Sequence, residues 1–207
     1  MQVTFLDAKP AVGMLCTRTR VIDEQGCAVV DLTDEHRRLY DTQDRKGRTY
    51  ATLAAHCVMF TSSILVRRRV FDAVGGYDPA FSACEDLDLY LRVASIAAIE
   101  CLATPLTRYR VHPGGSASHL NEAQVRVNAK HLEWLDREPG RDPQGDVRRA
   151  LVMSTARCHY VGRRYRDALR ALRSMPRGSW RLLLRPQNCI SVVRIIFRFL
   201  QTVLARA

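Results

Sequence analysis

The chain has 207 residues, of which 47% are hydrophobic, and it carries a formal net charge of +11 at pH 7. This length fits one full domain, or a partial domain with an appendage, and the apolar content excludes an intrinsically disordered chain. The charge is uneven: residues 1–118 hold 14 basic and 14 acidic side chains, whereas residues 119–207 hold 18 basic and 7 acidic ones.

The first 118 residues alternate between helical and extended patterns, which predicts an α/β fold. In chain order we expect a helix at 1–8, a strand at 12–22, a return strand at 27–32, a polar loop at 33–48, a helix at 50–57, a strand at 58–66, helices at 67–74 and 85–97, and two short strands at 99–102 and 106–111 on either side of Pro105. The pair Gly75-Gly76 ends the helix before it.

After Ser118 the pattern becomes helical. We expect helices at 119–136, 144–161 and 164–174, with breaks at Pro139, Gly140, Pro143 and Gly162. The segment around Tyr160–Tyr165 resembles one helix-turn-helix unit of the tetratricopeptide kind, which must pack on something else to bury its apolar face. The apolar segment 189–204 contains Arg194 and Arg198, so it is too short and too charged for a membrane span.

The cysteine pattern and the N-terminus indicate a reducing compartment. The seven cysteines are odd in number and form no Cys-x-x-Cys pair, which argues against a disulfide scaffold and against a structural zinc site. No signal peptide is expected, because an acid and a proline interrupt the first ten residues.

Two acidic residues, Glu85 and Asp86, open a predicted helix just after a glycine turn and the step Tyr77-Asp78-Pro79. Carboxylates are favoured at a helix N-terminus, so this pair could simply cap the helix. Its position at a loop-helix junction, where active-site residues gather, favours a catalytic role instead.

A second group of polar residues follows in the segment RYRVHPGG at residues 108–115. Arg108 and Arg110 alternate with a tyrosine, so one face of a strand would carry both guanidinium groups. His112 precedes a glycine pair and could bind a divalent metal or a diphosphate oxygen. The two arginines could equally form structural salt bridges with Asp86 or Asp88.

The run TSSILVRRRVFDAVGGYDPAFSACEDLDLYLRVA, followed by PLTRYRVHPGGSAS, resembles the C-terminal half of a family 2 glycosyltransferase of the GT-A fold. The resemblance spans residues 1–118 and is specific from 61 to 118. It implies a partial, Rossmann-like GT-A domain with a mixed sheet at 1–118. The N-terminal nucleotide-binding half is lacking, and an α-helical extension follows at 119–207.

The resemblance also implies site roles. Asp86 would be the catalytic base, and Glu85 would position the acceptor or hold Asp86 in place. His112 would complete a site for Mg²⁺ or Mn²⁺ or for the diphosphate, with Arg110 near the leaving group. The residues on the substrate side would be Gly75, Gly76, Tyr77, Arg108 and Arg110. The reaction would be an inverting transfer of a sugar from a nucleotide-sugar donor to a glycan or lipid-linked acceptor, as in bacterial envelope polysaccharide synthesis.

The sequence departs from this family in lacking an Asp-x-Asp metal motif before the first strand, so donor binding by this chain alone is not expected.

The basic extension admits two interpretations. In the first, its last helix packs on the preceding helical pair. In the second, the protein is cytoplasmic and this helix docks peripherally at the inner face of the plasma membrane, where four arginines would contact lipid phosphate. These are Arg181, Arg185, Arg194 and Arg198. A rival interpretation is a nucleic-acid-binding module, in which arginines interleaved with Tyr160, Tyr165 and Trp180 would follow a phosphate backbone. No known binding signature is present, so nucleic acid is not expected as a partner. The chain could also be a non-catalytic remnant that serves as an interaction surface.

Overall fold

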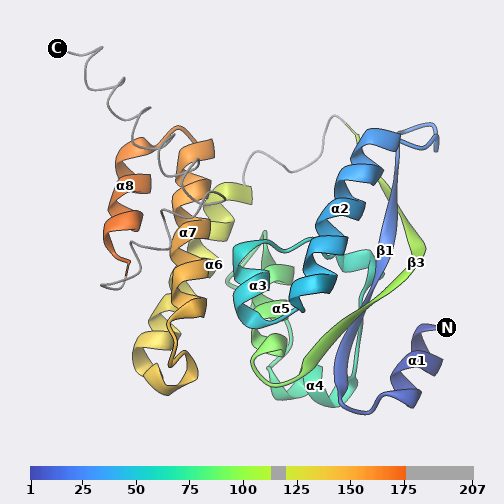
Figure 1. Cartoon of the computed structure of the whole chain (residues 1–207), viewed down its shortest axis with the longest axis horizontal. Helices are drawn as coiled ribbons and strands as arrows, with labels where there is room; N and C mark the ends of the chain where they lie inside the picture. The colour runs from blue at the N-terminus through green and yellow to red at the C-terminus, as the bar shows by residue number, and fades with distance from the viewer. Residues whose placement is uncertain (113–119, 176–207) are drawn as a thin grey trace. The chain divides into compact units, whose positions relative to one another are not determined.

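A computed structural model describes residues 1–112 and 120–175 of the chain. These residues divide into two compact units, one within Met1–Ala117 and the other within Ser118–Ala207, and each is described by itself (Figure 1). The end of the glycine-rich segment at 113–118, the apolar segment at 189–204, and Trp180, Arg181 and Arg185 lie outside the described residues.

The first unit is built around a three-stranded sheet in the order β2-β1-β3. The central strand β1 (Val12–Ile22) pairs in parallel with β3 (Ala98–Arg110) and antiparallel with the two-residue strand β2 (Leu65–Val66). The sheet is therefore mixed, as expected for a partial GT-A-like α/β domain. Strand β1 has the bounds that the sequence predicts, because its first half is an unbroken apolar run that is buried on both faces.

Pro105 interrupts the pairing of β3 without ending the strand. Thr17 pairs with Leu102, but the next residue of β1, Arg18, pairs with Pro105, so two residues of β3 bulge out. A second register shift follows, because Thr19 pairs with Thr107, so Pro105 lies between two irregularities where the ladder can do without its N–H. The two short strands predicted around Pro105 are therefore one continuous strand.

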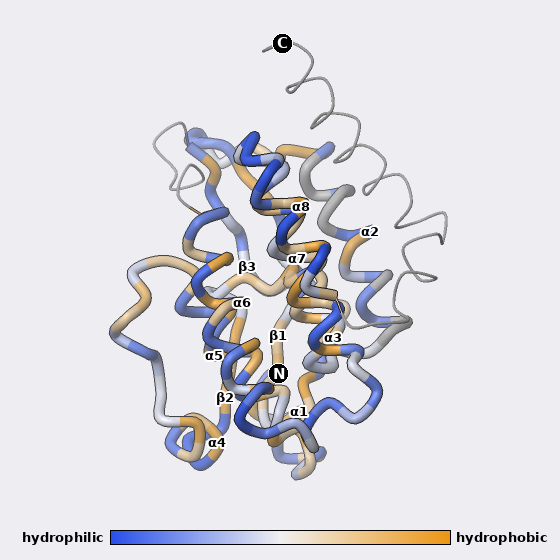
Figure 2. The backbone as a smooth tube through the Cα atoms, turned by 90° about the vertical axis from the view of Figure 1, so that its left-hand side faces the viewer, coloured by the Kyte–Doolittle hydropathy of each residue, from blue (hydrophilic) through white to orange (hydrophobic). Residues whose placement is uncertain are grey.

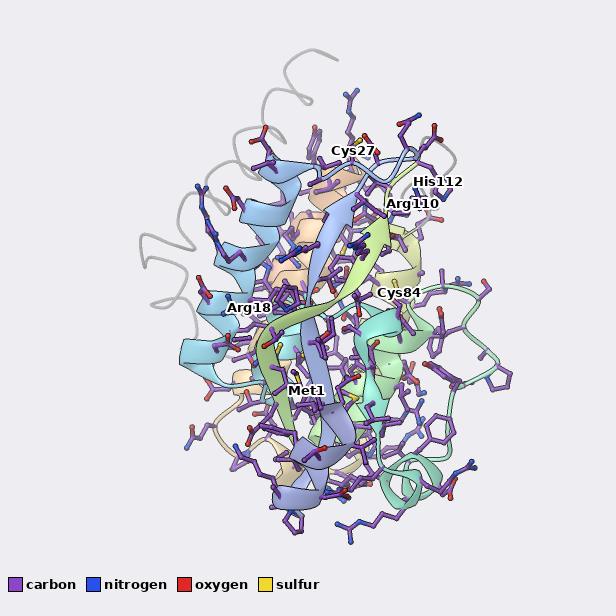
Figure 3. The ribbon with its side chains drawn as sticks, turned by 90° about the vertical axis from the view of Figure 1, so that its right-hand side faces the viewer. Met1, Arg18, Cys27, Cys84, Arg110 and His112 are labelled. Atoms are coloured by element: carbon purple, nitrogen blue, oxygen red, sulfur yellow. The ribbon has the colours of Figure 1, made fainter. Side chains whose placement is uncertain are left out.

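Helices cover both faces of the sheet (Figures 1 and 3). The predicted N-terminal helix is present as α1 (Gln2–Ala8), where Leu6 packs with Val12 and Leu15 of β1. The opposite face carries α3 (Tyr50–Ala55) and α5 (Glu85–Ala94), whose apolar side chains form much of the core. Helix α4 (Arg68–Ala73) follows β2.

The sequence-based expectation for residues 27–48 was wrong. The predicted return strand at 27–32 is reduced to a single bridge between Ile22 and Ala28. The predicted loop at 33–48 is a 17-residue helix, α2 (Val30–Lys46). Its composition is so polar that the helical period does not stand out, and contacts with β1 stabilise it instead.

Residues 58–66 also differ from the predicted strand. Only β2 is extended there, and Thr61–Ser63 form a short 3-10 turn, η1, which is stabilised by a hydrogen bond from the Ser63 hydroxyl to the Phe60 carbonyl (2.7 Å). Ser63 favours such a local bond over a regular strand, because its hydroxyl competes with the ladder.

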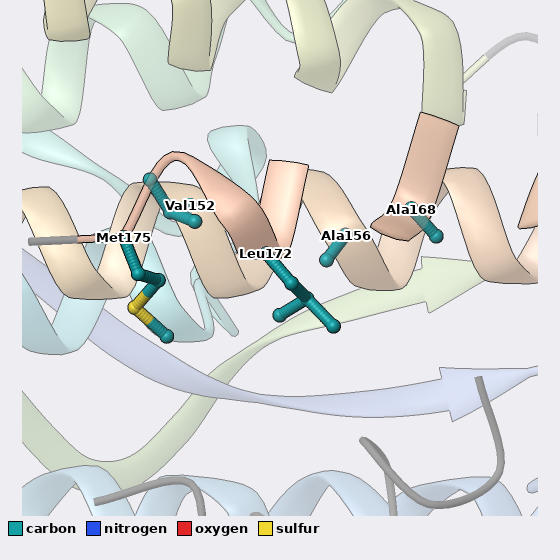
Figure 4. Packing of buried hydrophobic residues seen from close by; sticks show 5 residues of the cluster. All are labelled: Val152, Ala156, Ala168, Leu172 and Met175. Carbon is teal, nitrogen blue, oxygen red and sulfur yellow. The ribbon is translucent and has the colours of Figure 1, made fainter. Parts of the chain in front are cut away.

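The second unit is helical, as predicted. Helix α6 (Leu120–Arg137) leads through a 3-10 turn, η2 (Pro139–Arg141), into α7 (Asp146–Val161) and α8 (Tyr165–Arg173). Helices α7 and α8 form a hairpin with a shared apolar cluster (Figure 4), and α8 alternates hydrophobic with hydrophilic residues (Figure 2). The cluster consists of Val152, Ala156, Ala168, Leu172 and Met175. Polar bonds join α6 to α7, including Gln124 to Ser154 (2.9 Å).

None of the helices within residues 1–112 and 120–175 has the length and apolar character needed to cross a membrane.

Candidate functional site

The predicted acidic pair lies at the start of α5, where the chain makes a sharp turn. Cys84 precedes the helix with a left-handed φ of 57°, which is uncommon for a residue with a Cβ. Glu85 and Asp86 then occupy the first turn of the helix and are half-buried. Asp88 follows two residues after Asp86. The apolar face of α5 is fully buried, so the helix holds this turn in a fixed place.

Asp86 is fixed by two hydrogen bonds. The Thr61 hydroxyl donates to Asp86 Oδ2 (2.8 Å), and the Leu87 amide donates to Oδ1 (2.7 Å). The Tyr90 hydroxyl donates in turn to the Thr61 oxygen (3.4 Å). The Asp86 carboxylate is therefore oriented by neutral donors and keeps acceptor capacity for a further hydroxyl.

Thr61 is a site residue that the sequence did not single out. It precedes two serines in the run Thr-Ser-Ser, but a run of hydroxyl residues carries no specific signal. Only the fold of η1, 25 positions away in sequence, brings Thr61 to Asp86.

The glycine turn lies close to the acidic pair. Gly75 and Gly76 end α4 in a Schellman motif, with both residues at positive φ and with the Gly76 amide bonded to the Phe71 carbonyl (2.9 Å). The Tyr77 ring then stands edge-on to the Phe71 ring, with 5.9 Å between centroids. Burial, followed by the charges of Asp86 and Glu85, raises the pKa of the Tyr77 hydroxyl, so Tyr77 lies within electrostatic range of both carboxylates.

Asp88 has a different environment from Asp86. It is completely buried, and its Oδ2 accepts from Arg92 Nε (2.9 Å) and Nη2 (2.7 Å). Arg92 Nη1 also donates to the Val74 carbonyl, just before the glycine turn. Asp88 therefore anchors the C-terminal end of α4 to α5, and its guanidinium partner is Arg92 rather than Arg108 or Arg110.

The C-terminal end of β3 approaches the Asp86 region through an aromatic contact. The ring of Phe60, the neighbour of Thr61, lies 4.5 Å from the ring of Tyr109. Arg110 points elsewhere: its Nη1 donates to the carbonyls of Asp23 (2.8 Å) and Glu24 (2.6 Å) in the turn after β1.

Arg108 and His112 are both exposed. Arg108 pairs in register with Arg20 of β1, which places two cationic residues side by side. Figure 3 shows His112 next to Arg110 near Cys27, whereas Cys84, which precedes Glu85, lies apart from them. The fold thus brings Glu85, Asp86 and Tyr77 together, while Arg108, Arg110 and His112 form a second group at the end of β3.

The described residues do not fit a divalent metal by themselves. Across 1–112 and 120–175, no three His, Cys, Asp or Glu side chains lie close enough to share an ion. His112 therefore belongs to no group of three such side chains within this part of the chain.

The thiol of Cys57 lies within electrostatic range of Asp86. Burial raises the pKa of the half-buried Cys57 to about 12, and the negative charge of Asp86 contributes to this shift. The thiol remains protonated at neutral pH, so it does not act as a nucleophile there.

One further concavity, of about 430 Å³, lies between α1 and α4 and is separate from the carboxylates. It is lined by Asp7, Pro10, Arg67, Arg68 and Arg69. Arg67 and Arg69 donate to backbone carbonyls of residues 6–12, so these guanidinium groups hold α1 and its loop in place.

A comparison with protein families gives a match for the first unit. Residues 28–116 match the model of a family described as glycosyltransferase like family 2. The match includes both groups of predicted site residues, from Gly75 to His112. No curated protein matches the chain.

Proposed function

Because residues 28–116 form a partial glycosyltransferase-like family 2 domain, we propose that the chain is the acceptor-side half of an inverting transferase. In this proposal a sugar passes from a nucleotide-sugar to a glycan or lipid-linked acceptor. The observation that carries the proposal is the environment of Asp86, a half-buried carboxylate held by Thr61 beside Tyr77 and the glycine turn. That is an arrangement suited to receive a hydroxyl proton.

The proposed step is a single displacement with Asp86 as general base. The acceptor hydroxyl donates its hydrogen bond to Asp86, which takes the proton as the oxygen attacks the anomeric carbon of the donor. The bond from this carbon to the diphosphate breaks, and the nucleoside diphosphate leaves with the electron pair. Thr61 keeps the carboxylate in one orientation, which preserves the geometry of attack.

The remaining residues of the first group shape the acceptor pocket. Gly75 and Gly76 allow the tight turn that places the Tyr77 ring, and Tyr77 offers an apolar face and a hydroxyl to a sugar. Glu85 positions the acceptor from the same helix start. The buried pair of Asp88 and Arg92 keeps the turn and the helix together.

We assign the second group of residues, Arg108, Arg110 and His112, to the donor side of the active site. Arg108 is exposed and can meet a phosphate, whereas Arg110 shares its guanidinium with two carbonyls. Family 2 glycosyltransferases commonly use a divalent metal. The described residues alone do not hold one, so we assign no step of the reaction to it. His112 is proposed as a single ligand or diphosphate contact that needs residues from a donor-side half.

The first prediction concerns the Asp86→Asn variant, tested in a protein that joins this chain to a donor-side, nucleotide-binding half, with a panel of UDP-, GDP- and dTDP-sugars. Asparagine keeps the hydrogen bond from Thr61 but cannot take a proton. We expect nucleoside diphosphate release to fall by about 10²- to 10⁴-fold, the usual contribution of a general base. A glycan array provides a second measurement that needs no donor, and here Tyr77→Ala should lose binding.

The matched control is Asp72→Asn, an exposed carboxylate on α4 in the same unit, which should leave both measurements unchanged. Equal release by the wild type and Asp86→Asn would overturn the role of Asp86. A chain that neither releases nucleotide nor binds any glycan would contradict the transferase activity and favour a non-catalytic remnant.

A bacterial envelope acceptor would require contact with a membrane, and we propose that the basic extension provides it from the cytoplasmic side. The described part of the extension exposes several arginines at and along α8. These are Arg163, Arg166, Arg170 and Arg173. Co-sedimentation with phosphatidylserine vesicles, but not with phosphatidylcholine vesicles, is expected. Binding to an oligonucleotide with no vesicle binding would instead favour a nucleic-acid module.

A further inference from the structure

Two cysteines from distant parts of the chain lie side by side in the sheet. Cys16 of β1 and Cys101 of β3 are direct partners in the parallel pair, so their side chains project from the same face. Their thiols are close enough to share a hydrogen bond. Cys16 is completely buried, whereas Cys101 is half-buried. A small reagent therefore reaches Cys101 before Cys16.

A buried arginine faces this pair. The Arg48 side chain is only 4% exposed, and its Nη1 binds Asp44 Oδ1 at 2.6 Å. Its Nε and Nη2 are buried and have no hydrogen-bond partner among the described residues. A buried guanidinium with two unused donors is costly unless a negative charge is near. The electrostatic partners of Arg48 include both thiols, so a thiolate would supply that charge.

We propose that Cys101 is a peroxide-reactive thiolate and that Cys16 is its resolving partner, so that the chain carries an oxidation site separate from the proposed transferase site. The geometry of the strand pair and the unmatched donors of Arg48 carry this inference.

The surrounding charges support the proposed roles. The pKa of Cys101 is lowered chiefly by the hydrogen bond from Cys16, and then by the positive charges of Arg48 and Arg18, against burial and the negative charge of Asp44. The same hydrogen bond and burial raise the pKa of Cys16. Helix α2 adds the phenol of Tyr40, whose pKa is also raised by burial. The pKa of Cys101 is thus lowered, while the pKa of its neighbour Cys16 is raised, which keeps Cys16 a protonated donor.

The chemistry balances with one peroxide. The Cys101 thiolate attacks hydrogen peroxide, so an S–O bond forms, the O–O bond breaks, and the departing hydroxide takes a proton to become water. Cys16 then attacks the Cys101 sulfenic acid, so the S–S bond forms and the S–O bond breaks with release of a second water. Two thiols and one peroxide give one disulfide and two waters.

The disulfide would join β1 to β3 directly beside the bulge at Leu102–Pro105. It would link residues 85 positions apart in sequence and so fix the register of the strand that leads to Tyr109, Arg110 and His112.

The test treats the full chain under native conditions with hydrogen peroxide and then blocks the remaining thiols for peptide mass spectrometry. We expect a peptide linking Cys16 to Cys101, and a loss of free Cys101 at least about tenfold faster than that of the exposed Cys27, because thiolate content sets the rate. In Cys16→Ser, a sulfenic acid at Cys101 should accumulate and react with dimedone. In Cys101→Ser, neither product should form.

Arg48→Gln should slow the oxidation of Cys101, with Arg37→Gln, an exposed arginine on α2, as its control. Since Arg48→Gln could also unfold the unit, the pH dependence of iodoacetamide labelling in the wild type is the second measurement. The labelling midpoint of Cys101 should lie below that of Cys27. Equal midpoints, equal oxidation rates, or disulfides that form at random among the cysteines would each overturn the proposal.

Discussion

Two aspartates separated by one residue on α5 have opposite roles because of their partners. Asp88 is buried and forms an ion pair with the guanidinium of Arg92, so it has a structural role and is not available as a base. Asp86 is held by hydroxyl and amide donors and stays partly open, as a base must. The sequence Glu-Asp-Leu-Asp shows both carboxylates alike, and only their surroundings separate them.

The glycine turn gives a prediction at the residue scale. Gly76→Ala should destabilise the first unit by about 2 kcal/mol, because the left-handed φ of 68° disfavours a Cβ and the new methyl would lie 3.1 Å from the Phe71 ring. Gly75→Ala has the same kind of φ but open space, and should cost about 1 kcal/mol. Urea unfolding measures both variants.

Gly140→Ala is the control for the glycine pair, because Gly140 has open space and no positive φ. It should change the free energy of unfolding by less than about 0.5 kcal/mol. If Gly75→Ala and Gly76→Ala cost the same, the contact with Phe71 would not constrain the turn.

At the scale of elements, α2 shows how a polar helix is stabilised by its partners. Its sequence is rich in charge, and few positions contribute to the core, among them Tyr40. Arg18 of β1 reaches across to Asp41 and Asp44, and the Tyr40 hydroxyl donates to the Thr17 carbonyl (3.4 Å). These contacts come from another element, so the sequence alone predicts a strand at 27–32 and a loop at 33–48 instead of this helix.

Arg18→Met should therefore release α2. We expect hydrogen exchange to accelerate at the amides of residues 30–46, and the first unit to lose about 2 kcal/mol, the typical contribution of hydrogen bonds to charged groups. Arg37→Met removes a similar charge from an exposed pair with Asp34 and should cost about 0.3 kcal/mol. Unchanged exchange in Arg18→Met would show that α2 does not depend on this contact.

The hairpin of α7 and α8 gives a pH-dependent prediction. Burial, followed by the charges of Arg164 and Arg170, lowers the pKa of His159 against the attraction of Asp167. Its Nδ1 is buried and has no hydrogen-bond partner among the residues that the structure describes. In the unfolded chain His159 regains its ordinary pKa of 6.5. The unfolded state then binds a proton that the folded state excludes, so acid favours unfolding below that pH.

The stabilising effect of neutral His159 is thus full above pH 6.5 and is lost as the pH falls towards the lowered folded pKa. Thermal melts between about pH 8 and about pH 5, on either side of the ordinary histidine pKa, should show a larger loss for the wild type than for His159→Asn. The difference between the two proteins removes the contribution of the other histidines. Parallel pH profiles would contradict this assignment.

At the scale of the whole molecule, the chain combines a partial α/β unit with a helical unit. In the sheet of the first unit, β2 has only two residues, and its outer edge pairs with no strand among residues 1–112 and 120–175. A two-residue edge strand offers few backbone groups for pairing with a further strand. The division of labour between residues 1–118 and 119–207 stays a prediction.

The sequence alone determined the elements whose pattern is local. Unbroken apolar runs defined β1, the amphipathic period defined α5 to α8, and glycine marked the end of α4. The motif from Thr61 to His112 also indicated the family that the comparison found. These features are readable because each depends on neighbours within a few residues.

Only the tertiary structure decided what depends on distant partners. It made residues 30–46 a helix through Arg18, kept β3 continuous across Pro105 by a bulge, and brought Thr61 to Asp86. It also placed the two groups of site residues at different positions and set Cys16 against Cys101. Hydrogen bonds, ion pairs and strand register join residues far apart in the chain, and local sequence periodicity carries no information about them.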